Sequence, residues 1–110
     1  MKEKFDVEFL EQETDYLWSL DVKTRNKIIY NIDKSRYVND PKLFKKLDDE
    51  IWEFRTKFGG KQHRLLAFWV KKKNKLLLVI ATHGFVKKVS KVPKAEIEKA
   101  KALKNNYTNE

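Results

Sequence analysis

The sequence IWEFRTKFGGKQHRLLAFWVKKKNKLLLVIATHGFVKK, which spans residues 51–88, contains the strongest strand signals in the chain. In its first part, apolar residues alternate with Glu53, Arg55 and Lys57. Successive side chains of a strand point to opposite faces, so this alternation predicts a strand with one apolar face and one charged face.

Two nearly continuous apolar runs follow, residues 65–70 and 76–81. Such runs are typical of strands that are buried on both faces. The Gly59-Gly60 pair and the lysine-rich residues 71–75 lie at the spacing of hairpin turns. The segment therefore predicts three strands joined as an antiparallel meander.

The flanking sequence predicts a further strand and three helices. Residues 2–10 alternate as a short amphipathic strand, and residues 11–20 predict a helix. Asp21 can cap a second helix, so that the two form a helical hairpin, and residues 41–50 are expected to be a connector. Pro93 marks the start of a C-terminal helix. The expected fold class is α+β, with a small antiparallel sheet of about four strands that carries the N-terminal hairpin and the C-terminal helix.

Composition limits the class of protein. The chain has 110 residues, 41% hydrophobic and 13% aromatic, which suits one domain spanning residues 1–110 and excludes a disordered chain. It has no cysteine, which excludes disulfides, thiolate metal sites and cysteine nucleophiles. No apolar stretch approaches the roughly 20 residues of a membrane helix, and the N-terminus lacks the apolar core of a signal peptide. We therefore expect a soluble, cytoplasmic protein with no membrane partner.

Charge is distributed unevenly. Residues 1–50 hold ten Lys and Arg against twelve Asp and Glu, a net charge of −2, whereas residues 51–110 hold fifteen against four, a net charge of +11. Between residues 51 and 94 the only acid is Glu53. A short lysine run is commonly just a solvated surface, but a bias across half the chain favours a polyanionic partner, because neutralising phosphates releases counterions.

Common catalytic motifs are absent. The sequence has no nucleophile elbow, P-loop, zinc-protease or dinucleotide-binding signature. Two histidines without cysteines are too few for a histidine-built metal site, and acids are too scarce in the basic half for two-metal chemistry. We therefore expect neither a metal nor a cofactor.

Cations on a sheet can still be catalytic if the substrate is RNA. The 2′-hydroxyl of RNA supplies the nucleophile, so cleavage needs in-line positioning, removal of one proton, and donors for the charge that develops on the phosphate. Arg55 and Arg64 present planar donor forks that match phosphate oxygens. Lys57, Lys87 and Lys88 could add point charges.

Three other side chains have alternative interpretations. His83, next to Gly84, has an ordinary pKa of about 6.5 that suits proton transfer, but it could equally end a strand and bond to a loop. His63 is more often structural than catalytic at such a position. Phe85 could stack on an unpaired base, or it could pack in the core.

Several segments taken together resemble one protein family. WEFR, FGG, RLLAF and GFVKK, with LDVKTRNKIIYNI before them and VPKAEIEKAKAL after them, resemble the HigB-type branch of the RelE/ParE superfamily of toxins from type II toxin-antitoxin systems. The resemblance covers nearly the whole chain. It implies a small sheet faced by N-terminal helices, and a ribosome-dependent endoribonuclease that cuts messenger RNA in the decoding site.

The resemblance also implies partners and site residues. The partners are messenger RNA on the ribosome and a cognate antitoxin, commonly a helix-turn-helix protein, through which alone the toxin contacts operator DNA. Matching the motifs residue by residue assigns catalytic roles to Arg55 of WEFR, Arg64 of the next strand, and Lys87 and Lys88 of GFVKK, with His83 as a proton-transfer candidate. The residues expected to bind RNA are Lys57, Lys61, His63, Phe85 and Lys91.

Two departures from the family pattern affect these assignments. A tyrosine often precedes the strand arginine in the family, whereas His63 occupies that place here. The terminal segment continues as a helix through Tyr107, so a catalytic aromatic at the extreme C-terminus cannot be assigned. Because ParE-like members use the same scaffold to inhibit DNA gyrase, gyrase inhibition and nucleic-acid binding without catalysis stay open as alternatives.

Overall fold

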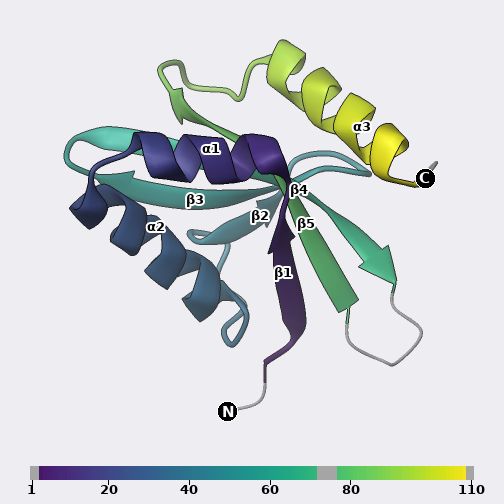
Figure 1. The fold of residues 1–110 in the computed structure, drawn as a ribbon, viewed down its shortest axis with the longest axis horizontal. Helices are drawn as coiled ribbons and strands as arrows, with labels where there is room; N and C mark the ends of the chain where they lie inside the picture. Colours follow the sequence, from purple (N-terminus) through teal and green to yellow (C-terminus); the bar gives the residue numbers. More distant parts are fainter. Residues whose placement is uncertain (1–2, 72–76, 109–110) are drawn as a thin grey trace.

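The computed structural model describes residues 3–71 and 77–108, and these form one curled sheet with helices on both faces (Figure 1). The fold class is α+β, as predicted. In chain order the elements are β1 (Phe5–Phe9), α1 (Glu11–Ser19), α2 (Val22–Ser35), β2 (Phe44–Lys46), β3 (Trp52–Phe58), β4 (Lys61–Lys71), β5 (Leu77–Lys87) and α3 (Lys94–Thr108).

The sheet differs from the prediction of about four antiparallel strands. The described residues form five strands in the order β1-β5-β4-β3-β2, and β1 runs parallel to β5 while all other pairs are antiparallel. The chain leaves β1, passes through both N-terminal helices and re-enters the sheet at its far edge. The meander then returns to β1, which brings β5 beside it in the same direction.

The fifth strand, β2, lies in the segment predicted to be a connector. Its first residue, Phe44, is buried and lies opposite Phe54 of β3, with the two rings stacked at a centroid distance of 4.3 Å. A strand of three residues carries too little alternation to be recognised in the sequence. Packing of one aromatic ring therefore recruits this segment to the sheet edge.

The predicted hairpin turn between β3 and β4 is confirmed. Phe58 lies opposite Lys61, and the two residues between them, Gly59 and Gly60, have φ angles of 60° and 75°. Positive φ at both central residues matches the two-residue turn that follows strand twist, and glycine adopts it without a steric penalty. The second predicted turn falls largely on residues 72–75, which lie outside the described residues, but β4 and β5 are antiparallel neighbours as expected.

All three predicted helices are present, but the first two do not pack as a hairpin. α1 lies against β5, whereas α2 lies against β3, so each helix covers its own part of the sheet. The Asp21 side chain accepts a hydrogen bond from the Thr24 amide at 3.2 Å and caps α2 as predicted. α2 ends at Ser35, several residues before Pro41, and α3 begins one residue after Pro93. Among the described residues, no helix is long and apolar enough to cross a membrane.

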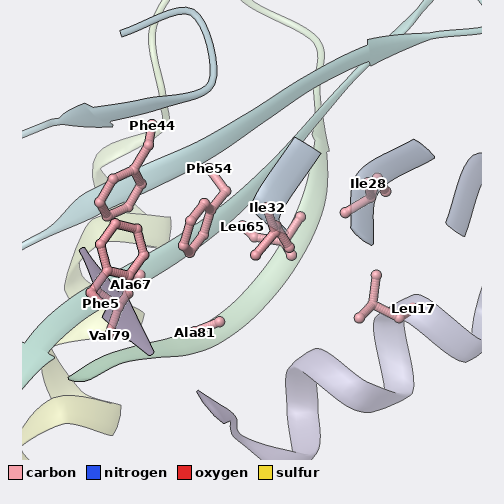
Figure 2. Close-up of a cluster of buried hydrophobic side chains, with 10 residues drawn as sticks. All are labelled: Phe5, Leu17, Ile28, Ile32, Phe44, Phe54, Leu65, Ala67, Val79 and Ala81. Carbon is pink, nitrogen blue, oxygen red and sulfur yellow. The ribbon is translucent and has the colours of Figure 1, made fainter. Parts of the chain in front are cut away.

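Buried side chains form one cluster on each face of the sheet. The cluster beneath α1 and α2 is shown in Figure 2, and its members are Phe5, Leu17, Ile28, Ile32, Phe44, Phe54, Leu65, Ala67, Val79 and Ala81. The second cluster joins Leu66, Phe68 and Ile80 to Ala100 of α3. The central strands are thus buried on both faces, as their apolar runs predict. Since the aromatic residues of β3 point to α2, its charged residues point to the other face.

The buried layer beneath α1 contains one carboxyl group. The Glu13 side chain is fully buried, and neither carboxylate oxygen has a hydrogen-bond partner among the described residues. Burial raises the pKa of Glu13 from 4.5 to about 8. The folded protein therefore holds Glu13 protonated at neutral pH, a state that the unfolded chain does not share.

This difference predicts that stability falls with rising pH. The unfolded chain loses the Glu13 proton near its ordinary pKa of 4.5, whereas the folded chain keeps it up to about 8. Between these values the contribution of Glu13 to the free energy of unfolding should fall by up to about 1.4 kcal/mol per pH unit. Glu13→Gln should flatten the slope, because the amide stays neutral, and the exposed control Glu11→Gln should not. Urea unfolding across this range measures the slope; an unchanged slope in Glu13→Gln would contradict the assignment.

Candidate functional site

Strand register places the predicted site arginines side by side on the face that carries α3. Arg55 of β3 lies directly opposite Arg64 of β4, which in turn lies opposite Phe85 of β5. The next row towards the Gly59-Gly60 turn consists of Lys57, Gln62 and Lys87. Residues two apart on a strand share a face, so both rows project to the same side.

A buried carboxylate lies between the two arginines. Glu53 is only 4% exposed, and its Oε1 is 3.3 Å from Arg55 Nε while its Oε2 is 3.5 Å from Arg64 Nε. Like charges directly opposite each other on neighbouring strands repel. The negative charge of Glu53 offsets this repulsion and so stabilises the arginine pair. Glu53 was not assigned a role from the sequence, although its being the only acid between residues 51 and 94 is a signal that could have identified it.

The two Nε atoms contact Glu53 as ion pairs only, and the hydrogen bonds of both guanidinium groups come from their Nη atoms. Arg64 Nη1 donates to the His63 carbonyl at 3.1 Å and Nη2 donates to Gln62 Oε1 at 2.7 Å. Arg55 Nη1 donates to the Pro41 carbonyl at 3.2 Å. Burial lowers the pKa of Arg64, Glu53 opposes this effect and Arg55 adds to it, but a guanidinium keeps its charge at neutral pH. Both arginines are therefore pre-oriented cations.

Two concavities meet at Arg55. One has a volume of about 250 Å³ and is lined by Lys42, Arg55, Lys57, Gln62 and Arg64. The other has a volume of about 290 Å³, and its lining includes Glu53, Arg55 and four further polar or charged residues. We define the cationic face as the basic residues that line either one: Lys42, Lys45, Arg55, Lys57, Arg64, Lys87 and Lys91.

Lys87 belongs to the cationic face, but Lys88 does not line either concavity. Lys87 donates to the Ser90 carbonyl at 3.4 Å, and its pKa is lowered by desolvation and by the charges of Arg64 and Arg55. Lys88 follows the last residue of β5 and is exposed. Lys61, at the start of β4, is likewise exposed and outside both concavities. Of the predicted RNA-binding lysines, Lys57 and Lys91 join the cationic face.

His63 lies on the opposite face of the sheet from Arg55 and Arg64, so it does not belong to the cationic face. It is 2% exposed, and its Nδ1 is 2.7 Å from the hydroxyl of Tyr16 on α1. Burial, followed by the charge of Lys61, lowers its pKa. Gly84 of β5 lies against the Tyr16 ring, where a Cβ atom would collide with it. The Tyr16–His63 bond therefore joins α1 to the sheet.

His83 is on the face of the arginines but is buried under α3. It is 3% exposed, with Nε2 3.1 Å from Glu96 Oε1 and Nδ1 3.1 Å from Thr82 Oγ1. Burial lowers its pKa. The neighbouring Phe85 stacks on the imidazole at a centroid distance of 5.9 Å and is half-buried. His83 lines neither concavity, so its contacts are those of a residue that holds α3 to the sheet.

α3 adds less positive charge than its sequence suggests. Lys101 pairs with Asp48 at 3.0 Å, and Lys104 pairs with Glu50 at 3.1 Å. These pairs fasten the helix to the loop before β3. Nowhere in residues 3–71 and 77–108 do three His, Cys, Asp or Glu side chains come close enough to hold a metal ion.

Comparison with known proteins identifies the family. No curated protein sequence matches the chain. Residues 15–105, which include α2, the sheet residues of the cationic face and most of α3, match the family described as Phage derived protein Gp49-like (DUF891). The chain therefore belongs to the Gp49-like family, a RelE/ParE-like family of toxins from toxin-antitoxin systems.

Proposed function

We propose that the protein is a HigB-type toxin that cleaves messenger RNA on the ribosome and is held inactive by an antitoxin. The family supports a toxin role and an antitoxin partner. The observation that carries the nuclease proposal is the Arg55–Arg64 pair, which is held by Glu53 where two concavities meet. Fixed donors of this kind are most useful to a reaction that builds negative charge at one point.

The reaction that fits this face is attack by a ribose 2′-hydroxyl, which gives up its proton to solvent water, on the adjacent phosphorus. The bond from phosphorus to the 5′-oxygen breaks, and the products are a 2′,3′-cyclic phosphate and a 5′-hydroxyl. Arg55, whose side chain is 29% exposed, can grip a non-bridging phosphate oxygen. Arg64 is buried, but only two of its five N–H groups donate a hydrogen bond to the described residues, which leaves donors for the concavity that it lines.

Lys87 suits the leaving group. Its pKa is lowered by desolvation and by the charges of Arg64 and Arg55, and a lysine with a lowered pKa gives up its proton more readily. Lys87 lines the same concavity as Arg55, so it can protonate the departing 5′-oxygen while Arg55 holds the phosphate. Lys42, Lys45, Lys57 and Lys91 surround these groups and provide electrostatic attraction for the RNA chain.

The first test removes the proposed catalytic cations. Arg55→Ala and Lys87→Ala should each lower the rate of cleavage of ribosome-bound messenger RNA by about 100-fold, the typical cost of losing one fixed donor. Lys23→Ala removes an exposed charge from α2, on the other face, and is the control. Primer extension on a reporter transcript measures the cuts. Wild-type cleavage by both site variants would refute the assignment, and DNA damage with intact message would indicate gyrase inhibition instead.

A second test separates positioning from binding. Glu53→Gln keeps the shape of the side chain but removes the charge that orients Arg55 and Arg64. RNA binding should be retained, because the face gains net positive charge, while kcat should fall by about tenfold as both guanidinium groups lose their fixed orientation. The free energy of unfolding should fall by about 3–5 kcal/mol, because the buried charge of Arg64 loses its ionic partner. Glu98→Gln, at an exposed position on α3, is the matched control.

Single-turnover cleavage and RNA binding, measured on the same preparations, distinguish these effects. A loss of RNA binding with unchanged kcat would show that Glu53 does not act by positioning the arginines.

A further inference from the structure

The largest cavity that we describe lies away from the cationic face, between β1 and α2. Its volume is about 370 Å³, and it is lined by Asp6, Val7, Glu8, Phe9, Ile29, Ile32, Asp33 and Arg36. β1 is an edge strand of the sheet, so one side of this groove is a strand with no neighbour beyond it among the described residues.

The backbone of β1 offers hydrogen-bonding groups to this groove. Successive residues of a strand direct their N–H and C=O groups to opposite sides, and Leu10, just after β1, donates to Ala81 at the end of β5. By this alternation Glu8 faces β5, whereas Val7 and Phe9 face the open edge. Arg36 Nε already occupies the Phe5 carbonyl at 2.9 Å, so the open part of the edge begins at Val7.

Apolar side chains are exposed beside this edge. Phe9 is 39% exposed and Ile29 is 45% exposed, and both line the groove. Of the six large hydrophobic residues that are exposed in the described parts of the chain, all but Val89 lie between residues 9 and 30: Phe9, Trp18, Val22, Ile29 and Tyr30. Phe9 and Ile29 thus place exposed apolar surface in the groove itself, beside its polar lining, and exposed apolar surface rimmed by polar residues is typical of a protein-binding site.

The charge of the groove is opposite to that of the cationic face. Its lining holds three carboxylates, Asp6, Glu8 and Asp33, against one guanidinium. That guanidinium, Arg36, is shared between Asp6 at 3.3 Å and Asp33 at 3.0 Å. Glu8 is exposed and forms no ion pair with the described residues. A ligand for this groove should therefore carry positive charge.

We propose that this groove binds an extended segment of a partner protein in which apolar residues alternate with lysine or arginine, and that the segment adds a strand to the edge of β1. Its backbone would pair with Val7 and Phe9, its apolar side chains would lie against Ile29 and Phe9, and its cations, which point to the other face, would meet Glu8 and Asp6. The identification of that partner as the antitoxin rests on the proposed function; the docking of the strand does not.

The groove and the cationic face lie on different parts of the sheet. The groove lies at the β1 edge and is bounded by α2, whereas the cationic face lies on β3, β4 and β5 on the face that carries α3. A strand docked on β1 therefore leaves Arg55 and Arg64 uncovered. To inhibit the toxin, such a partner would have to block access to the ribosome by its size, or cover the cationic face with another of its segments.

Two synthetic ten-residue peptides test the proposal, one alternating valine with lysine and the other alternating valine with glutamate. Amide hydrogen exchange of the full-length protein, followed by NMR, reports on each residue of β1. The lysine peptide should slow exchange at Val7 and Phe9 by at least about tenfold, with little change at Glu8, which already pairs with β5. The glutamate peptide should have no such effect.

Charge variants provide the matched control. Glu8→Lys should weaken binding of the lysine peptide by about fivefold, whereas Glu98→Lys, the same change at an exposed position on α3, should not. Glu8→Lys should also leave cleavage of messenger RNA unchanged. If the wild-type protein does not cleave messenger RNA, the nuclease proposal fails, but the docking proposal does not. The two proposals can therefore fail separately.

Three results would overturn the docking proposal. The first is unchanged exchange at Val7 and Phe9 with the lysine peptide, and the second is equal protection by the glutamate peptide. The third is slowed exchange of the same amides in the absence of peptide, if this protection increases with protein concentration and analytical ultracentrifugation shows a dimer. A second copy of this chain would then be the occupant of the groove.

Discussion

The geometry of the cationic face depends on one carboxylate. The register of β3 and β4 places Arg55 and Arg64 directly opposite each other, an arrangement that repulsion would oppose. Glu53 contacts both guanidinium groups from a position that is almost completely buried, so the attraction acts where water screens it little. The carboxylate leaves a net positive charge on the three residues and fixes where that charge points. A flexible lysine cluster would supply charge without this orientation.

The sheet separates two kinds of surface. On one face, α1 and α2 cover an apolar cluster to which Phe54 and Leu65 contribute, and the Tyr16–His63 bond fastens α1. On the other face, α3 covers the apolar part near Leu66 and Phe68 but leaves the cationic residues near the hairpin turn accessible. The edge next to α2 is acidic and apolar. One small fold thus carries a cationic face and an acidic, apolar edge groove at separate places.

Local patterns predicted most of the elements but little of their arrangement. Alternation over β3, the apolar runs of β4 and β5 and the Gly59-Gly60 turn are local signals, and each was confirmed. The parallel pairing of β1 and the recruitment of β2 were missed, because both depend on contacts between residues far apart in the chain. Packing of Phe44 on Phe54 is such a contact.

The same limit applies to the site residues. Strand alternation and the family motifs pointed to Arg55, Arg64 and Lys87, which the register brings to one face. His63 was placed in the site because it precedes Arg64, but adjacent residues of a strand point to opposite faces. Glu53 was overlooked since its role appears only when two strands are aligned. Burial of His83 under α3 likewise depends on Glu96, 13 residues away in the sequence.

The central claim is that fixed cations on this sheet assist an RNA strand that attacks itself through its own 2′-oxygen. The most direct measurement uses ribosome-bound messenger RNA in which a single 2′-deoxynucleotide replaces the ribonucleotide at the cleaved position. Binding should be unchanged, cleavage at that position should disappear, and the all-ribose control should yield a 2′,3′-cyclic phosphate end. Equal cleavage of the deoxy-substituted message would contradict the claim, because the nucleophile would then have to come from elsewhere.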